Sequence, residues 1–186
     1  MVARLTLRSA IDAVREGGDR VSDAAEFLGA LLENSDFLGG QGNADLLDRW
    51  GTPRSRRLLN AKQYKAALDA LLVHIRRAES PDLNVVRSLG RVRHGRAIRP
   101  LVSIVSSALA RNDATVWEQA FNSLENQAWA RRRSELEGKL ISIARSSRRS
   151  RDSTIRERAN GYLRARAAPS RTGVKMGRRA IPPKKR

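Results

Sequence analysis

Few residues in this chain belong to types that could do chemistry, and basic side chains predominate among them. The sequence holds 37 lysines and arginines against 19 aspartates and glutamates, which gives a formal net charge of +18. A balance this basic favours a polyanion as the binding partner. It argues against a neutral scaffold and against an acidic disordered tail.

The residue types that carry most enzymatic and metal chemistry are scarce. The chain has no cysteine, which excludes disulfides, cysteine-ligated zinc, iron–sulfur clusters and thiol catalysis. The two histidines, His74 and His94, have no second histidine or carboxylate at ligand spacing. The sequence also lacks a Walker-type phosphate loop, a dinucleotide-binding glycine pattern and a Gly-x-Ser-x-Gly turn. We therefore expect no metal, no cofactor and no catalytic residue, and a protein that is not an enzyme.

The charge is distributed unevenly along the chain. Residues 1–50 hold 5 basic and 9 acidic residues, and residues 51–100 hold 12 and 3. Residues 101–150 hold 8 and 5, and residues 151–186 hold 12 and 2. A field of one sign confined to one region steers a ligand to that region. The acidic first fifty residues are therefore expected to have another role, as a cap on the fold or as a surface for a protein partner.

The elements that must position these charges are predicted to be helices. Apolar residues recur at helical spacing almost throughout, whereas alternating strand patterns are missing, which predicts an all-α fold. A first helix is predicted from about Val2 to Glu16, and a second from Ser22 as its N-cap. Thr52-Pro53 is typical of an N-cap followed by proline at the first helical position. A longer helix is predicted over about residues 61–79.

From Ser80 onward the helical pattern repeats. Ser80, Thr115 and Thr154 each stand where an N-cap belongs, 35 and then 39 residues apart, and Glu118 and Glu157 complete capping boxes in the second and third units. Counted from each cap, the first, fifth and ninth residues form one apolar stripe three times: Pro81, Val85 and Leu89; Val116, Ala120 and Leu124; Ile155, Ala159 and Leu163. Partner helices are predicted around residues 98–109 and 134–144. This period predicts stacked helical repeats, and the alternative is an ordinary helical bundle.

One of these units resembles a known repeat. Ser88-Leu89-Gly90-Arg91-Val92, followed by Arg96-Ala97-Ile98-Arg99-Pro100-Leu101-Val102, resembles the HEAT-like repeat, in which a first helix ends in Leu-Gly and Ala-Val/Ile-x-Pro-Leu opens the second. The units at 115–150 and 154–166 match in their first helices only. The resemblance implies a right-handed α-solenoid. The chain would then comprise an acidic N-terminal helical cap (1–50), HEAT-like helical repeats (51–166) and a basic disordered tail (167–186).

In HEAT-like solenoids the second helices line the concave surface, so the resemblance implies a basic groove. It places nine candidate nucleic-acid-binding residues on or near that groove: Arg96, Arg99, Arg131, Arg132, Arg133, Lys139, Arg145, Arg148 and Arg149. The tail adds seven more: Arg171, Lys175, Arg178, Arg179, Lys184, Lys185 and Arg186. This tail cannot bury enough apolar surface to fold alone, and a mobile basic arm neutralises phosphates without reading sequence.

The sequence thus predicts a non-catalytic nucleic-acid-binding protein that holds the backbone of duplex DNA or of structured RNA. Aromatic residues make up only 4% of the chain, so no platform for stacking successive bases is expected. No window is apolar enough for a membrane-spanning helix or a secretory signal. We therefore expect no membrane contact and a cytoplasmic, nucleic-acid-associated location, or a nuclear one in a eukaryote.

Two alternatives remain at this point. The first is a HEAT-repeat adaptor for protein–protein interaction, whose basic groove binds an acidic partner. The second is a glycosylase, because a basic groove on such a scaffold is similar to that of HEAT-like alkylpurine DNA glycosylases. For the latter the sequence offers only Trp117 and Trp129 near Glu118 and Glu125. Both tryptophans are instead expected to pack in the core or between repeats.

Overall fold

The computed structural model describes residues 5–36, 44–53, 58–131 and 134–167. Within these ranges the chain forms nine α-helices, one short 3-10 helix and no strand, which confirms the all-α prediction for this part. The helices are α1 (Leu7–Glu16), α2 (Val21–Asp36), α3 (Ala44–Arg49), α4 (Ala61–Arg77), α5 (Leu83–Arg91), η2 (Gly95–Ala97), α6 (Ile98–Arg111), α7 (Ala114–Arg131), α8 (Ser134–Ser147) and α9 (Ser153–Ala167).

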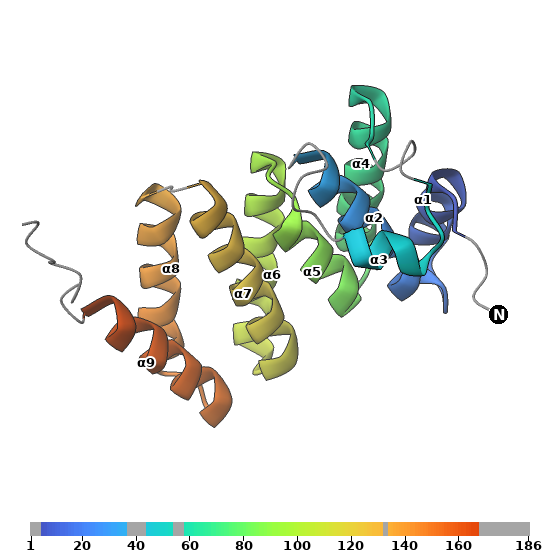
Figure 1. Ribbon diagram of the computed structural model, residues 1–186. Coiled ribbons are helices and arrows are strands. Elements are labelled where there is room, and N and C mark those ends of the chain that lie inside the picture. Colours follow the sequence, from blue (N-terminus) through green and yellow to red (C-terminus); the bar gives the residue numbers. More distant parts are fainter. Residues whose placement is uncertain (1–4, 37–43, 54–57, 132–133, 168–186) are drawn as a thin grey trace, which may run out of the picture.

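The longer helices lie in two rows (Figure 1). In the first row α2, α5, α7 and α9 follow one another, and each packs against the next. Behind them lie α4, α6 and α8, which form the second row. Each second-row helix packs against the first row: α4 against α2 and α5, α6 against α7, and α8 against α7 and α9. The N-terminal helix α1 packs against α2 and α4, so the acidic N-terminal helices share one hydrophobic core with the rest.

Aspartates cap three of the first-row helices. The Asp82 carboxylate accepts from the backbone N–H groups of Asn84 (2.8 Å) and Val85 (3.3 Å). Asp113 and Asp152 each accept from the N–H three residues on, at 3.0 Å. The predicted caps are therefore wrong by two residues in each case: Ser80, Thr115 and Thr154. A carboxylate at this position satisfies free N–H groups and also complements the positive end of the helix dipole.

Two other predicted helix starts also differ from the structure. Helix α1 begins at Leu7 because Thr6 and Ser9 form a capping box, in which each hydroxyl accepts from the other residue's N–H at 3.2 and 2.9 Å. Helix α2 begins at Val21, one residue before the predicted cap Ser22. Thr52-Pro53 begins no described helix, and residues 54–57 lie outside the described ranges. The predicted helix over 61–79 corresponds to α4.

Two glycines let the first-row helices approach closely. Ser88 of α5 lies against Gly29 of α2, and its hydroxyl donates to the Ala25 carbonyl at 2.8 Å. In the same way, Ser123 of α7 lies against Gly90 of α5, and its hydroxyl donates to a carbonyl of α5 at 3.1 Å. The two serines are 35 residues apart, so this helix contact recurs with the period of the first two predicted units.

The third contact in the row is ionic. Thirty-five residues after Ser123 stands Arg158 of α9, which forms a salt bridge with Glu125 of α7 and donates to Asn122 at 2.9 Å. The predicted apolar stripe of α9 faces the core, because Ile155 and Ala159 are buried and Leu163 packs against them.

The tryptophans of α7 have opposite environments. Trp117 is 0% exposed and stacks on Phe121 with ring centroids 4.8 Å apart, as predicted for a core residue. Trp129 is 83% exposed, so its predicted burial is wrong. The inward position at this end of α7 belongs to Gln127, whose side-chain amide donates to the carbonyls of Leu89 (2.8 Å) and Val92. Trp129, two residues further on, is left facing solvent.

Burial raises the pKa of the Tyr162 phenol above its usual value of 10.0, although the Arg166 guanidinium over the ring opposes the shift. In the unfolded chain the phenol loses its proton first, so the free energy of unfolding falls as the pH rises through about 10. We expect Tyr162→Phe to lose less stability than the wild type between about pH 9 and about pH 11. Urea unfolding across this range measures the difference, and parallel losses in both proteins would contradict it.

Candidate nucleic-acid interface

The second-row helices α6 and α8 present the same kind of outer face. On α6, Arg99, Ser103, Ser107 and Arg111 are exposed and follow one another at four-residue intervals. On α8 and the turn after it, Lys139, Ser142, Arg145 and Arg149 are exposed on one side. We call these sets the α6 stripe and the α8 stripe. Each places cations at both ends with serine between them, and a four-residue step rises about 6 Å along a helix.

Most cations of these stripes have no acidic partner within the described residues. Arg99, Arg145 and Arg149 form no ion pair there. Arg111 donates to the Ser107 hydroxyl at 2.6 Å, within its own stripe. Lys139 pairs with Glu135 at 3.2 Å, but both side chains are well exposed, and such surface pairs are weak. The guanidinium groups of the stripes can therefore meet an anionic ligand without breaking a strong internal contact.

Several arginines of the first row behave differently, because they join helices. Arg91 of α5 pairs with Glu33 of α2 at 3.9 Å, and Arg158 of α9 pairs with Glu125 of α7. A third pair links Arg166 of α9 to Glu137 of α8. Some arginines of the described residues thus connect helices, whereas Arg99, Arg111, Arg145 and Arg149 of the two stripes face solvent.

Two grooves lie between neighbouring second-row helices. The α4–α6 groove has a volume of about 740 Å³ and the α6–α8 groove about 390 Å³. The cations of the α4–α6 groove are Arg76, Arg96, Arg99 and Arg111, and its lining also holds Glu79, Leu72, Ile75, Ala78, Pro81, Pro100, Ser103, Ile104 and Ser107. The α6–α8 groove is lined by Gly95, Ile98, Arg99, Val102, Glu135, Leu136 and Lys139. Arg99 borders both grooves.

The structure separates the predicted site residues into several places. Arg96 and Arg99 share the α4–α6 groove, and Arg99 shares the α6–α8 groove with Lys139. Arg148 borders a different hollow against α9, and Arg145 and Arg149 are exposed near the end of α8. Arg96 also forms a 2.7 Å ion pair with Asp69 of α4, which ties η2 to α4. The following candidates lie outside the described side chains: Arg131, Arg132, Arg133, Arg171, Lys175, Arg178, Arg179, Lys184, Lys185 and Arg186.

The structure adds four residues to the site that the sequence did not predict as nucleic-acid-binding. Ser103, Ser107 and Arg111 complete the α6 stripe, and Arg76 of α4 faces α6 across the groove. The sequence could have predicted Ser103, Ser107 and Arg111, because they follow Arg99 at steps of four residues and so lie on one helix face. No local pattern connects Arg76 to Arg99, since their proximity depends on how α4 and α6 are placed.

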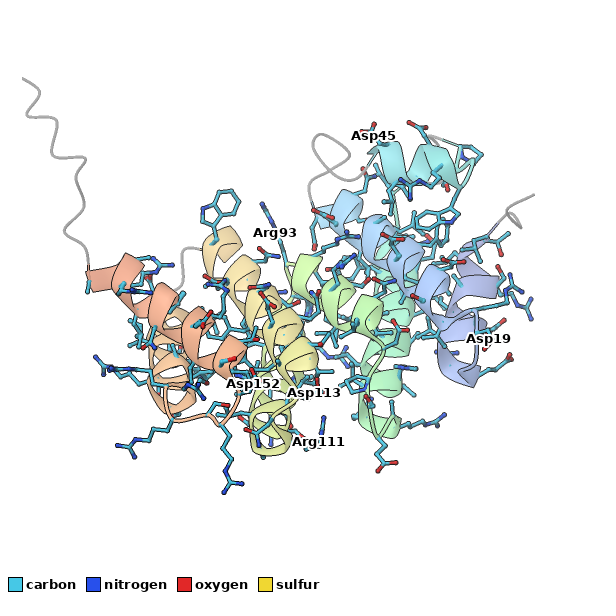
Figure 2. All side chains as sticks on the ribbon, turned by 90° about the horizontal axis from the view of Figure 1, so that it is seen from below. Asp19, Asp45, Arg93, Arg111, Asp113 and Asp152 are labelled. Carbon is cyan, nitrogen blue, oxygen red and sulfur yellow. The ribbon has the colours of Figure 1, made fainter. Side chains whose placement is uncertain are left out.

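The acidic N-terminal region lies away from the α8 stripe. Asp19 and Asp45 are at the opposite end of the molecule from α8 and α9 (Figure 2). Arg111, at the end of the α6 stripe, lies near the capping residue Asp113 (Figure 2). The basic residues are not confined to the other end, because α4 packs against α1 and α2 and carries Lys62, Lys65, Arg76 and Arg77.

The histidines have structural contacts. His74 Nδ1 lies 3.3 Å from the Val14 carbonyl, between α4 and α1, and His94 Nδ1 accepts from the Arg96 N–H at 3.3 Å. Among the described residues no group of three histidine, aspartate or glutamate side chains is arranged to hold a metal ion. None of the described helices combines the length and the apolar character needed to span a membrane.

Comparison with known proteins provides no family for this chain. No protein-family model, no curated protein and no solved structure matches it.

Proposed function

We propose that this chain is a non-catalytic nucleic-acid-binding protein, in which the α6 and α8 stripes hold the backbone of duplex DNA or of structured RNA. The observation that carries the proposal is the recurrence of exposed cations and serines on two neighbouring second-row helices. Arginine, lysine and serine side chains are among the groups that most often contact phosphate oxygens. Such contacts position a nucleic acid without reading its sequence.

We also propose that the helix pairs α5–α6 and α7–α8 are HEAT-like repeats of a right-handed solenoid. The 35-residue recurrence of Ser88 and Ser123 supports this, because equivalent residues of successive repeats make equivalent contacts. In this proposal the basic residues after Ala167 form a disordered arm that adds phosphate contacts. The acidic helices at the other end would repel the ligand, which favours binding on the α8 side.

The test is fluorescence-anisotropy binding of the full chain to a labelled duplex of about 20 base pairs, or two helical turns. The variant Arg145→Glu/Arg149→Glu removes two cations of the α8 stripe. The matched control is Arg20→Glu/Arg87→Glu, whose residues are also exposed but lie outside both stripes. Each arginine-to-glutamate change alters the charge by two units, so both variants change +18 to +14.

We expect the α8 variant to bind the duplex at least about tenfold more weakly, since two phosphate contacts are replaced by repulsion. The control should stay within about threefold of the wild type. Equal weakening of both variants would show that only total charge matters and would contradict an α8 interface. An absence of binding to duplex DNA, single-stranded DNA and hairpin RNA at low salt would contradict the function itself.

A further inference from the structure

The α4–α6 groove has a floor that a nucleic-acid backbone would not use. Leu72 of α4 and Ile104 of α6 are 5% and 7% exposed, and the half-buried Ile75 and Pro100 extend this aliphatic lining. None of the described residues that line the groove is aromatic, so they offer no ring on which a base could stack. Phosphate groups gain nothing from aliphatic contacts. The floor therefore suits aliphatic side chains of another polypeptide.

The rim of the same groove is cationic. Arg76 lies on the α4 side, where its Nε donates to the Leu72 carbonyl at 3.2 Å, which holds the head group beside the floor. Arg99 and Arg111 lie at the two ends of the α6 side. Arg96 is already paired with Asp69, and Glu79 is the acidic residue of the lining. A partner with carboxylates on both flanks of an aliphatic face would complement this arrangement.

The groove runs beside α6, whose 14 residues correspond to a length of about 21 Å. The α6 residues that line it recur at three- and four-residue steps from Arg99 to Arg111, so nearly the whole helix contributes one face. This length matches about four turns of a helix lying parallel to α6. Helix-in-groove recognition uses anchors at i, i+3, i+4 and i+7 on the bound helix.

We propose that the α4–α6 groove docks an acidic amphipathic helix of a partner protein. Leucine or isoleucine side chains of that helix contact Ile75, Pro100 and the floor beneath them. Its aspartates and glutamates meet Arg76 on one side and Arg99 and Arg111 on the other. This site is separate from the α8 stripe and goes beyond the nucleic-acid function proposed above. It shares Arg99 and Arg111 with the α6 stripe, so the partner helix and a nucleic acid would compete for these two arginines, whereas Arg76 belongs to the groove alone.

The experiment uses the full chain and two labelled peptides of about 16 residues, which is about four helical turns. The first peptide carries leucines at i, i+3, i+4 and i+7 positions with glutamates elsewhere. The second replaces every leucine with serine and keeps the charge. Fluorescence anisotropy measures both against the wild type, against Arg76→Glu/Arg111→Glu, and against the α8 variant Arg145→Glu/Arg149→Glu. The substituted arginines are all exposed, and circular dichroism checks that each variant is folded.

We expect the leucine peptide to bind the wild type at least about tenfold more tightly than the serine peptide, because burial of its apolar face adds to charge attraction. The Arg76→Glu/Arg111→Glu variant should lose at least about tenfold in affinity for it, while the α8 variant should stay within about threefold. Equal binding of the two peptides would overturn the proposal, since the groove would then attract only charge. Equal losses in the two variants would overturn it as well.

Duplex binding by the single variant Arg76→Glu separates this site from the nucleic-acid interface, because Arg76 lies outside both stripes whereas Arg111 belongs to the α6 stripe. If Arg76→Glu loses affinity for the duplex as strongly as for the leucine peptide, the groove belongs to the nucleic-acid site and the docking proposal is wrong. The proposed nucleic-acid function would survive that result. Conversely, the full chain could bind the leucine peptide but no nucleic acid. That result would support the docking proposal and contradict only the proposed nucleic-acid function.

Discussion

Replacing Trp117 with alanine is expected to lower the free energy of unfolding by about 3–5 kcal/mol. The indole is fully buried and stacks on Phe121, whose ring in turn meets Tyr162 of α9 edge-on with centroids 5.1 Å apart. Alanine would leave a cavity at the junction of α7 and α9 and would remove an aromatic contact. Urea unfolding followed by far-ultraviolet circular dichroism measures the loss without relying on tryptophan fluorescence.

Trp129→Ala is the matched control for this prediction. The same substitution on the same helix removes a side chain that is 83% exposed, so the free energy of unfolding should change by less than about 0.5 kcal/mol. Losses of similar size at Trp117 and Trp129 would contradict the described packing of α7.

Gly90→Ala is expected to destabilise the protein even though alanine is the better helix former. A Cβ at Gly90 would lie 2.6 Å from the Ser123 Cβ and 2.8 Å from its Cα, so α5 and α7 would have to separate. Overpacking costs about 1–3 kcal/mol and the threatened Ser123 hydrogen bond about 1 kcal/mol, against about 1 kcal/mol gained from helix propensity. We expect a net loss of about 1–3 kcal/mol in the free energy of unfolding.

Gly138→Ala is the matched control for this prediction. It should stabilise the protein if the close contact between α5 and α7 is what makes Gly90→Ala destabilising. Gly138 lies within α8, and an added Cβ there meets nothing within 4 Å. Its replacement should stabilise the protein by up to about 1 kcal/mol. Combining Gly90→Ala with Ser123→Gly should recover part of the loss, because it removes the side chain that the new methyl group meets. A stabilising effect of Gly90→Ala, similar to that at Gly138, would show that α5 and α7 do not approach closely.

Helical periodicity predicted the elements better than their beginnings. The predicted helices over 61–79 and 98–109 agree with α4 and α6 within two residues at each end, because their apolar stripes face the core. The N-caps failed where several polar residues compete within a few positions, as in Asp152-Ser153-Thr154. Which of them caps the helix depends on where the chain turns after the preceding helix, and the pattern of apolar residues does not contain that information.

The sequence also predicted part of the candidate site. The HEAT-like resemblance assigned Arg99, Lys139 and Arg145 to second helices, and the structure places Arg99 on α6 and the other two on α8. The sequence could not show which arginines form salt bridges, because their acidic partners are distant in sequence. Glu125 is 33 residues from Arg158, and Asp69 is 27 residues from Arg96. Only the packing of the helices decides which cations remain available to a ligand.

The salt dependence of duplex binding tests phosphate contact by the α8 stripe most directly. The logarithm of the association constant falls linearly with the logarithm of the salt concentration, with a slope near 0.9 for each phosphate neutralised. We predict that Arg145→Glu/Arg149→Glu makes this slope shallower by about 2, whereas Arg20→Glu/Arg87→Glu leaves it unchanged. Identical slopes for the wild type and the α8 variant would contradict a backbone interface on α8.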